Sequence, residues 1–267
     1  MTTRRTFIKT SALAGAAAVA STANILARPA NHQPKNMNEL YELRIYTLKD
    51  ETQQKLVEDY WQNAAIPALN KSGISPVGVF TELKPIGQTK LIVLIPFKKM
   101  EDFLSMTGNL DKDSTYQQKA AAYLNAPATD PAYERIESSL LRAFDHMPQL
   151  ELPGIQSRIF ELRQYQSASE SAGKKKIEMF NNEGEIGVFK RLGFKPVFYA
   201  ETLIGTLRPN LTYMLTFDDM AAHDSHWKAF GSDPEWKKIS SMPDYSDAKL
   251  VSKITSTFLV PVTFSQV

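Results

Sequence analysis

A carboxylate, a guanidinium group and a phenol recur at alternate positions in two places along the chain. Arginine clamps anions with a fork of N–H donors, tyrosine donates a proton, and glutamate serves as a base when desolvation raises its pKa. We therefore predict six ligand-binding residues: Glu42, Arg44, Tyr46, Glu161, Arg163 and Tyr165. Tyr46 and Tyr165 are also candidate catalytic groups. The alternative is that each glutamate and arginine form a structural ion pair.

Two histidines, His223 and His226, lie three positions apart in a stretch with helical character. Residues at this spacing share one helix face, which permits ligation of a metal or haem, and imidazole exchanges protons near neutral pH. The pair is therefore a candidate metal site, and His226 is a third candidate catalytic residue. The alternative is a surface or capping role, because no third ligand is near in sequence.

The segments that carry the Glu-x-Arg-x-Tyr sets are copies of one another. Residues 41–46 (YELRIY) recur as residues 160–165 (FELRQY), and Gly73 matches Gly193 further on. A separation of about 120 positions is the length of a small domain and too long for a solenoid repeat. We therefore interpret the chain as a duplicated domain whose halves could enclose one shared pocket.

The hydrophobic pattern predicts the same order of elements in each half. In the first half we expect strands at 40–48, 77–83, 90–97 and 136–144, with helices at 52–71 and 99–106. In the second half we expect strands at 160–166, 197–203, 211–217 and 251–262, with helices at 172–192 and 220–230. Pro67 should kink the first helix. The order β-α-β-β-α-β is that of a ferredoxin-like domain.

These elements predict an α+β fold with two tandem ferredoxin-like domains, packed as one pseudo-symmetric barrel. The domains should span residues 39–147 and 158–267, with a linker at 148–157. Because one face of each sheet takes the helices, we expect the apolar residues there and both polar sets in the barrel interior. Whether the barrel closes within one chain or between two chains stays open, and a homo-oligomer is possible.

One difference between the halves suggests an insertion. Asp130-Pro131 and Asp233-Pro234 lie only 103 positions apart. If these dipeptides correspond, the first half holds roughly 17 extra residues near 108–126. Lys174 to Lys176 should be a solvated helix start, and Trp61, Trp227 and Trp236 should lie in the core.

The first 27 residues have the three parts of a secretory signal. Arg4 and Arg5 precede a short apolar run at 12–20, and the arginine pair is typical of the Tat export signal. We therefore expect a periplasmic or secreted protein with a polar lead-in at 28–38. Many Tat substrates carry a cofactor, so a cofactor is considered, but the sequence does not name one.

Composition excludes several classes of function. The chain has no cysteine, so disulfides, thiolate nucleophiles and cysteine metal ligands are excluded. Its formal net charge is only +2, which gives no basic field for nucleic acid. No segment after the signal is apolar enough to insert stably in a membrane.

The ordered motifs resemble the NIPSNAP family. The resemblance rests on the two opening strands, on the helix end at Arg191-Leu192-Gly193-Phe194, on the strand 211–217, and on Ser232-Asp233-Pro234-Glu235-Trp236 after Trp227. It covers residues 158–262 best. The resemblance implies a dimeric α/β-barrel type of domain and implies little about chemistry.

Three functions are compatible with these observations. The first is an exported NIPSNAP-like protein that binds a small, partly apolar ligand in the barrel interior. The second, by analogy of fold, is a cofactor-independent monooxygenase-like or haem-dependent enzyme. The third is a structural or interaction protein.

Overall fold

The computed structural model describes residues 38–154 and 158–267. The predicted signal peptide at 1–27 and nearly all of the lead-in lie outside the described residues. Within these two described ranges, every helix is too short or too polar to cross a bilayer.

Eight antiparallel strands of the described residues close into one barrel. They are β1 (Leu40–Leu48), β2 (Gly78–Glu82), β3 (Thr89–Phe97), β4 (Arg135–Ala143), β5 (Ile159–Gln166), β6 (Lys195–Ile204), β7 (Asn210–Phe217) and β8 (Lys253–Pro261). Their order around the barrel is β1-β3-β2-β8-β5-β7-β6-β4. Each half therefore supplies a four-stranded sheet, and the sheets join through β2–β8 and β4–β6. The barrel closes within a single chain, and the predicted fold class is confirmed.

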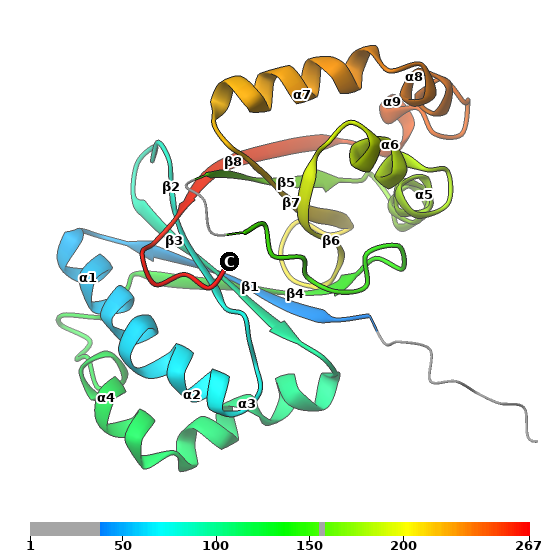
Figure 1. The fold of residues 1–267 in the computed structure, drawn as a ribbon. Helices are drawn as coiled ribbons and strands as arrows, with labels where there is room; N and C mark the ends of the chain where they lie inside the picture. Colours follow the sequence, from blue (N-terminus) through cyan, green and yellow to red (C-terminus); the bar gives the residue numbers. More distant parts are fainter. Residues whose placement is uncertain (1–37, 155–157) are drawn as a thin grey trace, which may run out of the picture. The chain divides into compact units, whose positions relative to one another are not determined.

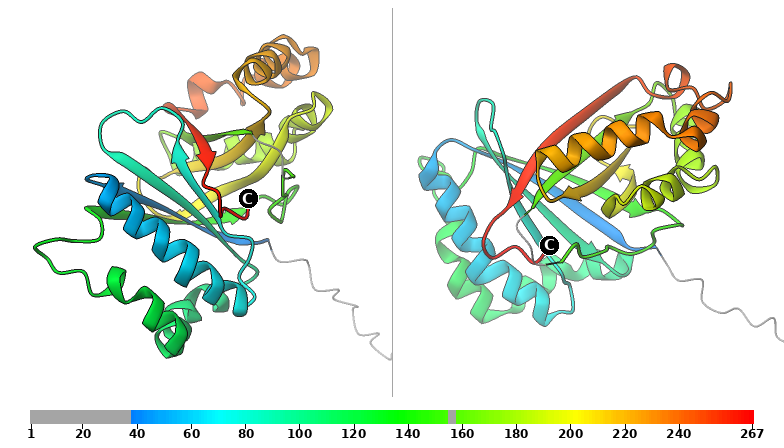
Figure 2. Two further views of the ribbon diagram at one scale, coloured as in Figure 1. Left: turned by 60° about the vertical axis from the view of Figure 1, so that its left-hand side comes forward. Right: turned by 45° about the horizontal axis from the view of Figure 1, so that its top comes forward.

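Helices cover the outer face of each four-stranded sheet. The first half contributes α1 (Glu51–Tyr60), the π-helical turn η1 (Trp61–Ala65), α2 (Ile66–Lys71), α3 (Met100–Lys112) and α4 (Ser114–Leu124). The second half contributes α5 (Glu170–Asn181), α6 (Glu185–Arg191), α7 (Met220–Ser232), α8 (Pro234–Ser240) and α9 (Asp247–Leu250). The two groups of helices lie on opposite sides of the barrel (Figure 1), as two further views also show (Figure 2).

The barrel interior is packed with apolar side chains from both halves. The ring centroid of Phe80 on β2 lies 4.9 Å from that of Phe160 on β5. The ring centroids of Tyr41 on β1 and Phe198 on β6 lie 5.2 Å apart. Aromatic pairs at these distances contribute more to stability than the burial of their surface alone. These two pairs therefore stabilise the packing of one sheet against the other.

The predicted assignment of strand faces is wrong. Tyr41 and Leu43 point into the barrel, whereas Tyr46 packs in the cluster under the helices. Glu42 and Arg44 alternate with the interior residues and therefore lie on the helix side with Tyr46. The same reversal applies to the second set on β5. The reason is that both faces of these strands are buried and carry apolar residues, such as Leu48 on the helix side and Leu43 in the interior, so alternation alone does not fix which face meets the helices.

The predicted insertion is also wrong. Asp113 caps α4 and forms an ion pair with Lys71, with Nζ 2.9 Å from Oδ2. Asp233 caps α8 and pairs with Arg191, also at 2.9 Å. Both pairs are related by the same separation of about 120 positions. Asp113, not Asp130, is therefore the counterpart of Asp233, and the two halves keep one spacing.

The first long helix is interrupted where a proline was expected to kink it. The π-helical turn η1 precedes Pro67, and the Ile66 N–H donates to the Trp61 carbonyl five residues back. Proline has no N–H to donate and its ring crowds the preceding turn. The wider π turn accommodates it, and such turns are frequent at functional sites.

Candidate functional site

The two Glu-x-Arg-x-Tyr sets lie under separate helix layers, outside the barrel. In the first half, Arg44 and Ser138 both donate to Glu42 Oε1 at 2.6 Å. In the second half, Arg163 and Ser256 donate to Glu161 Oε1 at the same distance. Each serine comes from the neighbouring strand. The conserved geometry of the two halves is therefore a glutamate held between its own arginine and a serine of the next strand.

A tryptophan covers each arginine, but it arrives from a different helix. The Arg163 guanidinium lies 4.3 Å from the ring of Trp227 on α7. The Arg44 guanidinium lies 5.8 Å from the ring of Trp61, which comes from η1. Cation–π contacts of this kind stabilise a partly desolvated cation. The two polar sets thus share the same glutamate, arginine and serine contacts, but the tryptophan that covers the arginine comes from a different helical element in each half.

His223 joins the second set. Its Nε2 lies 3.3 Å from Glu161 Oε2, and its Nδ1 lies 2.8 Å from an Asp224 oxygen. Trp227 Nε1 donates to the same Glu161 oxygen at 2.9 Å. The structure therefore brings one predicted histidine to the predicted Glu161 site. Glu161 already accepts from arginine, serine and tryptophan, so its oxygens are engaged by the protein itself.

His226 lies apart from this site. Its Nδ1 is 2.7 Å from the carbonyl of Ala222, and its ring packs against Phe194. Among the residues described, no three side chains of histidine, aspartate or glutamate gather closely enough to hold a metal. Nothing in this geometry therefore favours His223 and His226 as joint ligands.

Both candidate tyrosines bind other phenols. The Tyr46 hydroxyl lies 3.2 Å from that of Tyr123, and the Tyr213 hydroxyl donates to Tyr165 at 3.0 Å. Burial raises the pKa of Tyr46 and of Tyr165. Both phenols therefore stay protonated near neutral pH and act in this structure as hydrogen-bond partners within the core.

A buried lysine next to the second set was missed. Lys176 was expected in a solvated helix start, yet it is fully buried. Its Nζ lies 3.2 Å from Glu185 Oε2 and 3.1 Å from Asp247 Oδ1. Aromatic rings of Tyr165, Phe180 and Trp236 surround it at 5.3 to 5.5 Å. The sequence signal was available, because Lys176 lies four positions before Phe180 on the same helix face.

Burial of this cluster changes the acidity of its carboxyl group. Desolvation raises the pKa of Glu185 to about 7, and the nearby Lys176 opposes that rise. Glu185 therefore titrates close to neutral pH, whereas most carboxyl groups are ionised there.

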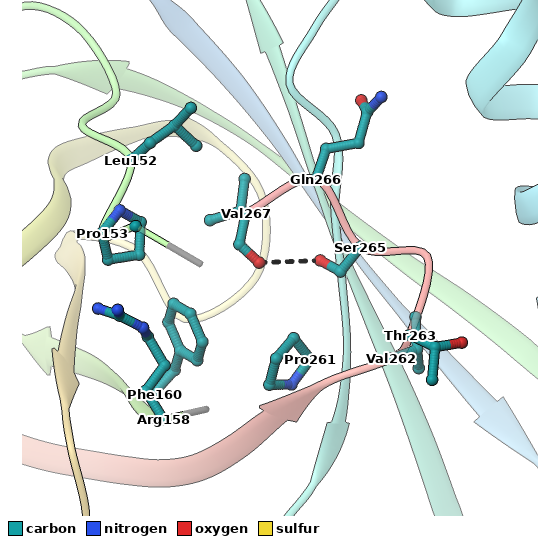
Figure 3. A pocket seen from close by; sticks show the side chains of 11 residues that line it. Leu152, Pro153, Arg158, Phe160, Pro261, Val262, Thr263, Ser265, Gln266 and Val267 are labelled. Carbon is teal, nitrogen blue, oxygen red and sulfur yellow. Dashed lines mark hydrogen bonds between the residues drawn. The ribbon is translucent and has the colours of Figure 1, made fainter. Parts of the chain in front are cut away.

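An open pocket lies at one end of the barrel. It has a volume of about 370 Å³ and is lined by Leu152, Pro153, Gly154, Arg158, Phe160, Pro261, Val262, Thr263, Ser265, Gln266 and Val267. Figure 3 shows Arg158 and Phe160 side by side on one wall, with Pro261 and Val267 opposite. The Gln266 side chain points away and accepts from the Val77 N–H. All of the lining residues come from the linker or from the second half, and residues 262–267 run beside the start of β2 of the first half, where the Gln266 N–H donates to the Val77 carbonyl.

The NIPSNAP family sequence profile matches residues 41–147 and 160–266. The chain belongs to the NIPSNAP family. The NIPSNAP domain is therefore present twice in tandem. No curated protein matches the chain.

Several solved structures are similar to this NIPSNAP protein. A candidate monooxygenase from Fusobacterium nucleatum is 10% identical, with a TM-score of 0.55 over 85% of this chain and 94% of that one. Another from Lactobacillus acidophilus is 9% identical, with a TM-score of 0.54 over 84% and 94%. A NIPSNAP family protein from Agrobacterium tumefaciens is 20% identical, with a TM-score of 0.37 over 44% and 97%. At these identities the first two show the dimeric α/β-barrel fold alone.

The Glu161 site yields a stability prediction for the NIPSNAP protein. Glu161→Gln should lower the free energy of unfolding by about 3–5 kcal/mol, because the Arg163 cation would stay buried without its counter-ion. Urea denaturation measures this change. Glu201→Gln breaks the exposed pair with Arg142 and should cost less than about 1 kcal/mol. Equal, small losses in both variants would contradict the account of Glu161.

The Glu185 site yields a pH prediction. Its pKa of about 7 in the folded protein exceeds that of an unfolded glutamate, near ~4.3. The folded state therefore binds more protons between these values. Stability falls as pH rises from about 4.3 to about 7, by at most ~1.4 kcal/mol per pH unit, and this loss is complete above about 7.

The free energy of unfolding can be measured by urea denaturation at several pH values between about 4 and 8. Glu185→Gln should remove the decrease of this free energy with pH that Glu185 causes. The exposed control Glu137→Gln should keep the wild-type slope. A slope that is identical in all three proteins would contradict the raised pKa.

Proposed function

We propose that this NIPSNAP protein binds a small, partly apolar ligand, and that the ligand occupies the pocket at the barrel end. The observation that carries the proposal is the pocket itself. Its volume of about 370 Å³ lies within the usual range for small-molecule sites, which combine apolar walls with a few polar groups.

The lining supports a ligand with one apolar and one polar end. Phe160, Pro261 and Val267 offer apolar surface, and the Arg158 guanidinium adds positive charge on the same wall as Phe160.

The other candidate sites support ligand binding less well. The barrel interior is packed with side chains, and the carboxylate of Glu161 already accepts from protein donors. A ligand at either place would have to displace existing contacts. The role of the six Glu-x-Arg-x-Tyr residues in ligand binding stays a prediction.

Fluorescence titration with N-phenyl-1-naphthylamine, an apolar aromatic probe, tests the site. We expect saturable binding that is weakened at least about tenfold by Leu152→Trp, which places an indole in the pocket, a loss of roughly 1.4 kcal/mol. Leu104→Trp is the matched control, because Leu104 is exposed on α3 and should leave binding unchanged. Absence of saturable binding, or equal binding by wild type and Leu152→Trp, would contradict the proposal.

We also propose that the Tat-type sequence at 1–27 exports the folded protein. The support is the pair Arg4 and Arg5 before a short apolar run. In a host with a working Tat pathway, the full chain should appear in the periplasmic fraction, and Arg4→Lys with Arg5→Lys should keep it in the cytoplasm. Unchanged export of the double variant would argue for another route.

A further inference from the structure

A second pocket lies on the helical surface of the first half, away from the barrel end. It has a volume of about 260 Å³ and opens between α2 with η1 on one side and α4 on the other. Its buried lining residues are Ala64, Ala68 and Tyr116. Lys71, Asp113, Thr115 and Lys119 lie at its exposed or half-exposed rim.

Local sequence explains why this place is hollow. Ala64 lies in the π-helical turn, and Ala68 lies in the short helix after it. Small side chains at both positions leave space that a larger residue would fill. Tyr116 is held in place because its hydroxyl lies 2.9 Å from that of Tyr60. The apolar lining is therefore built on fixed side chains.

A polar groove continues from this pocket. It shares Lys71, Asp113 and Thr115 with the pocket and adds Lys112 to the lining. Lys71 pairs with Asp113, and Lys112 and Lys119 add two further positive charges. The combined site therefore has an apolar end beside an excess of positive charge, which complements an amphiphilic anion.

The second half provides an internal comparison, because its residues correspond at a separation of about 120. Val188, Trp236 and Ile239 stand where the first half has Ala68, Tyr116 and Lys119, and they pack in or against the apolar core of that half.

The charges at the corresponding rim differ as well. Glu235 stands at the position of Thr115, and Arg191 pairs with both Asp233 and Glu235. At this place the second half therefore has larger core side chains where the first half has Ala68 and Tyr116, and Arg191 has two carboxylate partners where Lys71 pairs with Asp113.

We propose that the pocket between α2 and α4 is a binding site for a small amphiphilic carboxylate. Its short aliphatic or single-ring end would contact Ala64, Ala68 and Tyr116. Its carboxylate would face the lysines at the rim and in the groove. This site is independent of the barrel-end pocket.

Methyl NMR of alanine- and valine-labelled full-length protein, titrated with octanoate, tests the proposal. We expect saturable shifts of the Ala64 and Ala68 methyl groups with a dissociation constant of about 1 mM or below. Thr115→Glu and Lys119→Ile each introduce the residue of the second half, and each should raise that constant at least about fivefold. Gln118→Glu is the matched control, because it adds the same charge on α4 outside the lining and should change the constant less than twofold.

Three outcomes would overturn the proposal. The first is the absence of saturable shifts at Ala64 and Ala68 up to about 10 mM octanoate, which corresponds to very weak binding. The second is equal weakening by Thr115→Glu and Gln118→Glu, which would show attraction to surface charge alone. The third is a shift confined to Val262 and Val267, which would place octanoate in the barrel-end pocket.

Discussion

Closure of eight strands within one chain is the constraint on which the rest of the structure depends. The β2–β8 and β4–β6 pairings seal the barrel, so its interior must be filled by side chains from both halves. Helices cover the outer face of each sheet. Both faces of a strand such as β1 are therefore removed from water, and each polar side chain on it needs a partner within the protein.

The polar repeat satisfies that requirement in the same way in both halves. Glu42 and Glu161 each hold an arginine and a serine of the adjacent strand, which cross-links neighbouring strands on the helix side. Lys176 shows the same rule in the second half, where carboxylates and aromatic rings surround its ammonium group. These groups are engaged by the protein itself, whereas the pockets at the barrel end and on the helical surface of the first half are open.

Much of the fold was predictable because its signals are local. The duplication and the alternating strands predicted two ferredoxin-like units, and the family match and the barrel confirm them. Alternation alone could not predict which strand face lies in the barrel interior and which lies under the helices, since a residue such as Tyr46 suits either buried face. The contact of His223 with Glu161 joins residues from α7 and β5, and the ion pair of Lys176 with Asp247 joins residues from α5 and α9. Such contacts depend on tertiary packing, which periodicity does not encode. The prediction of an insertion was wrong because it matched the Asp130-Pro131 and Asp233-Pro234 dipeptides. The true counterpart of Asp233 is Asp113, since both cap the N-terminus of a helix.

We propose that the ligand lies at the barrel end and neither inside the barrel nor beside Arg163. The most direct measurement is an anomalous difference map from crystals of the protein soaked with a brominated N-phenyl-1-naphthylamine. We expect a bromine peak between Phe160, Pro261 and Val267. A peak within the ring formed by Tyr41, Phe80 and Phe198, or under α7 beside Arg163, would contradict it.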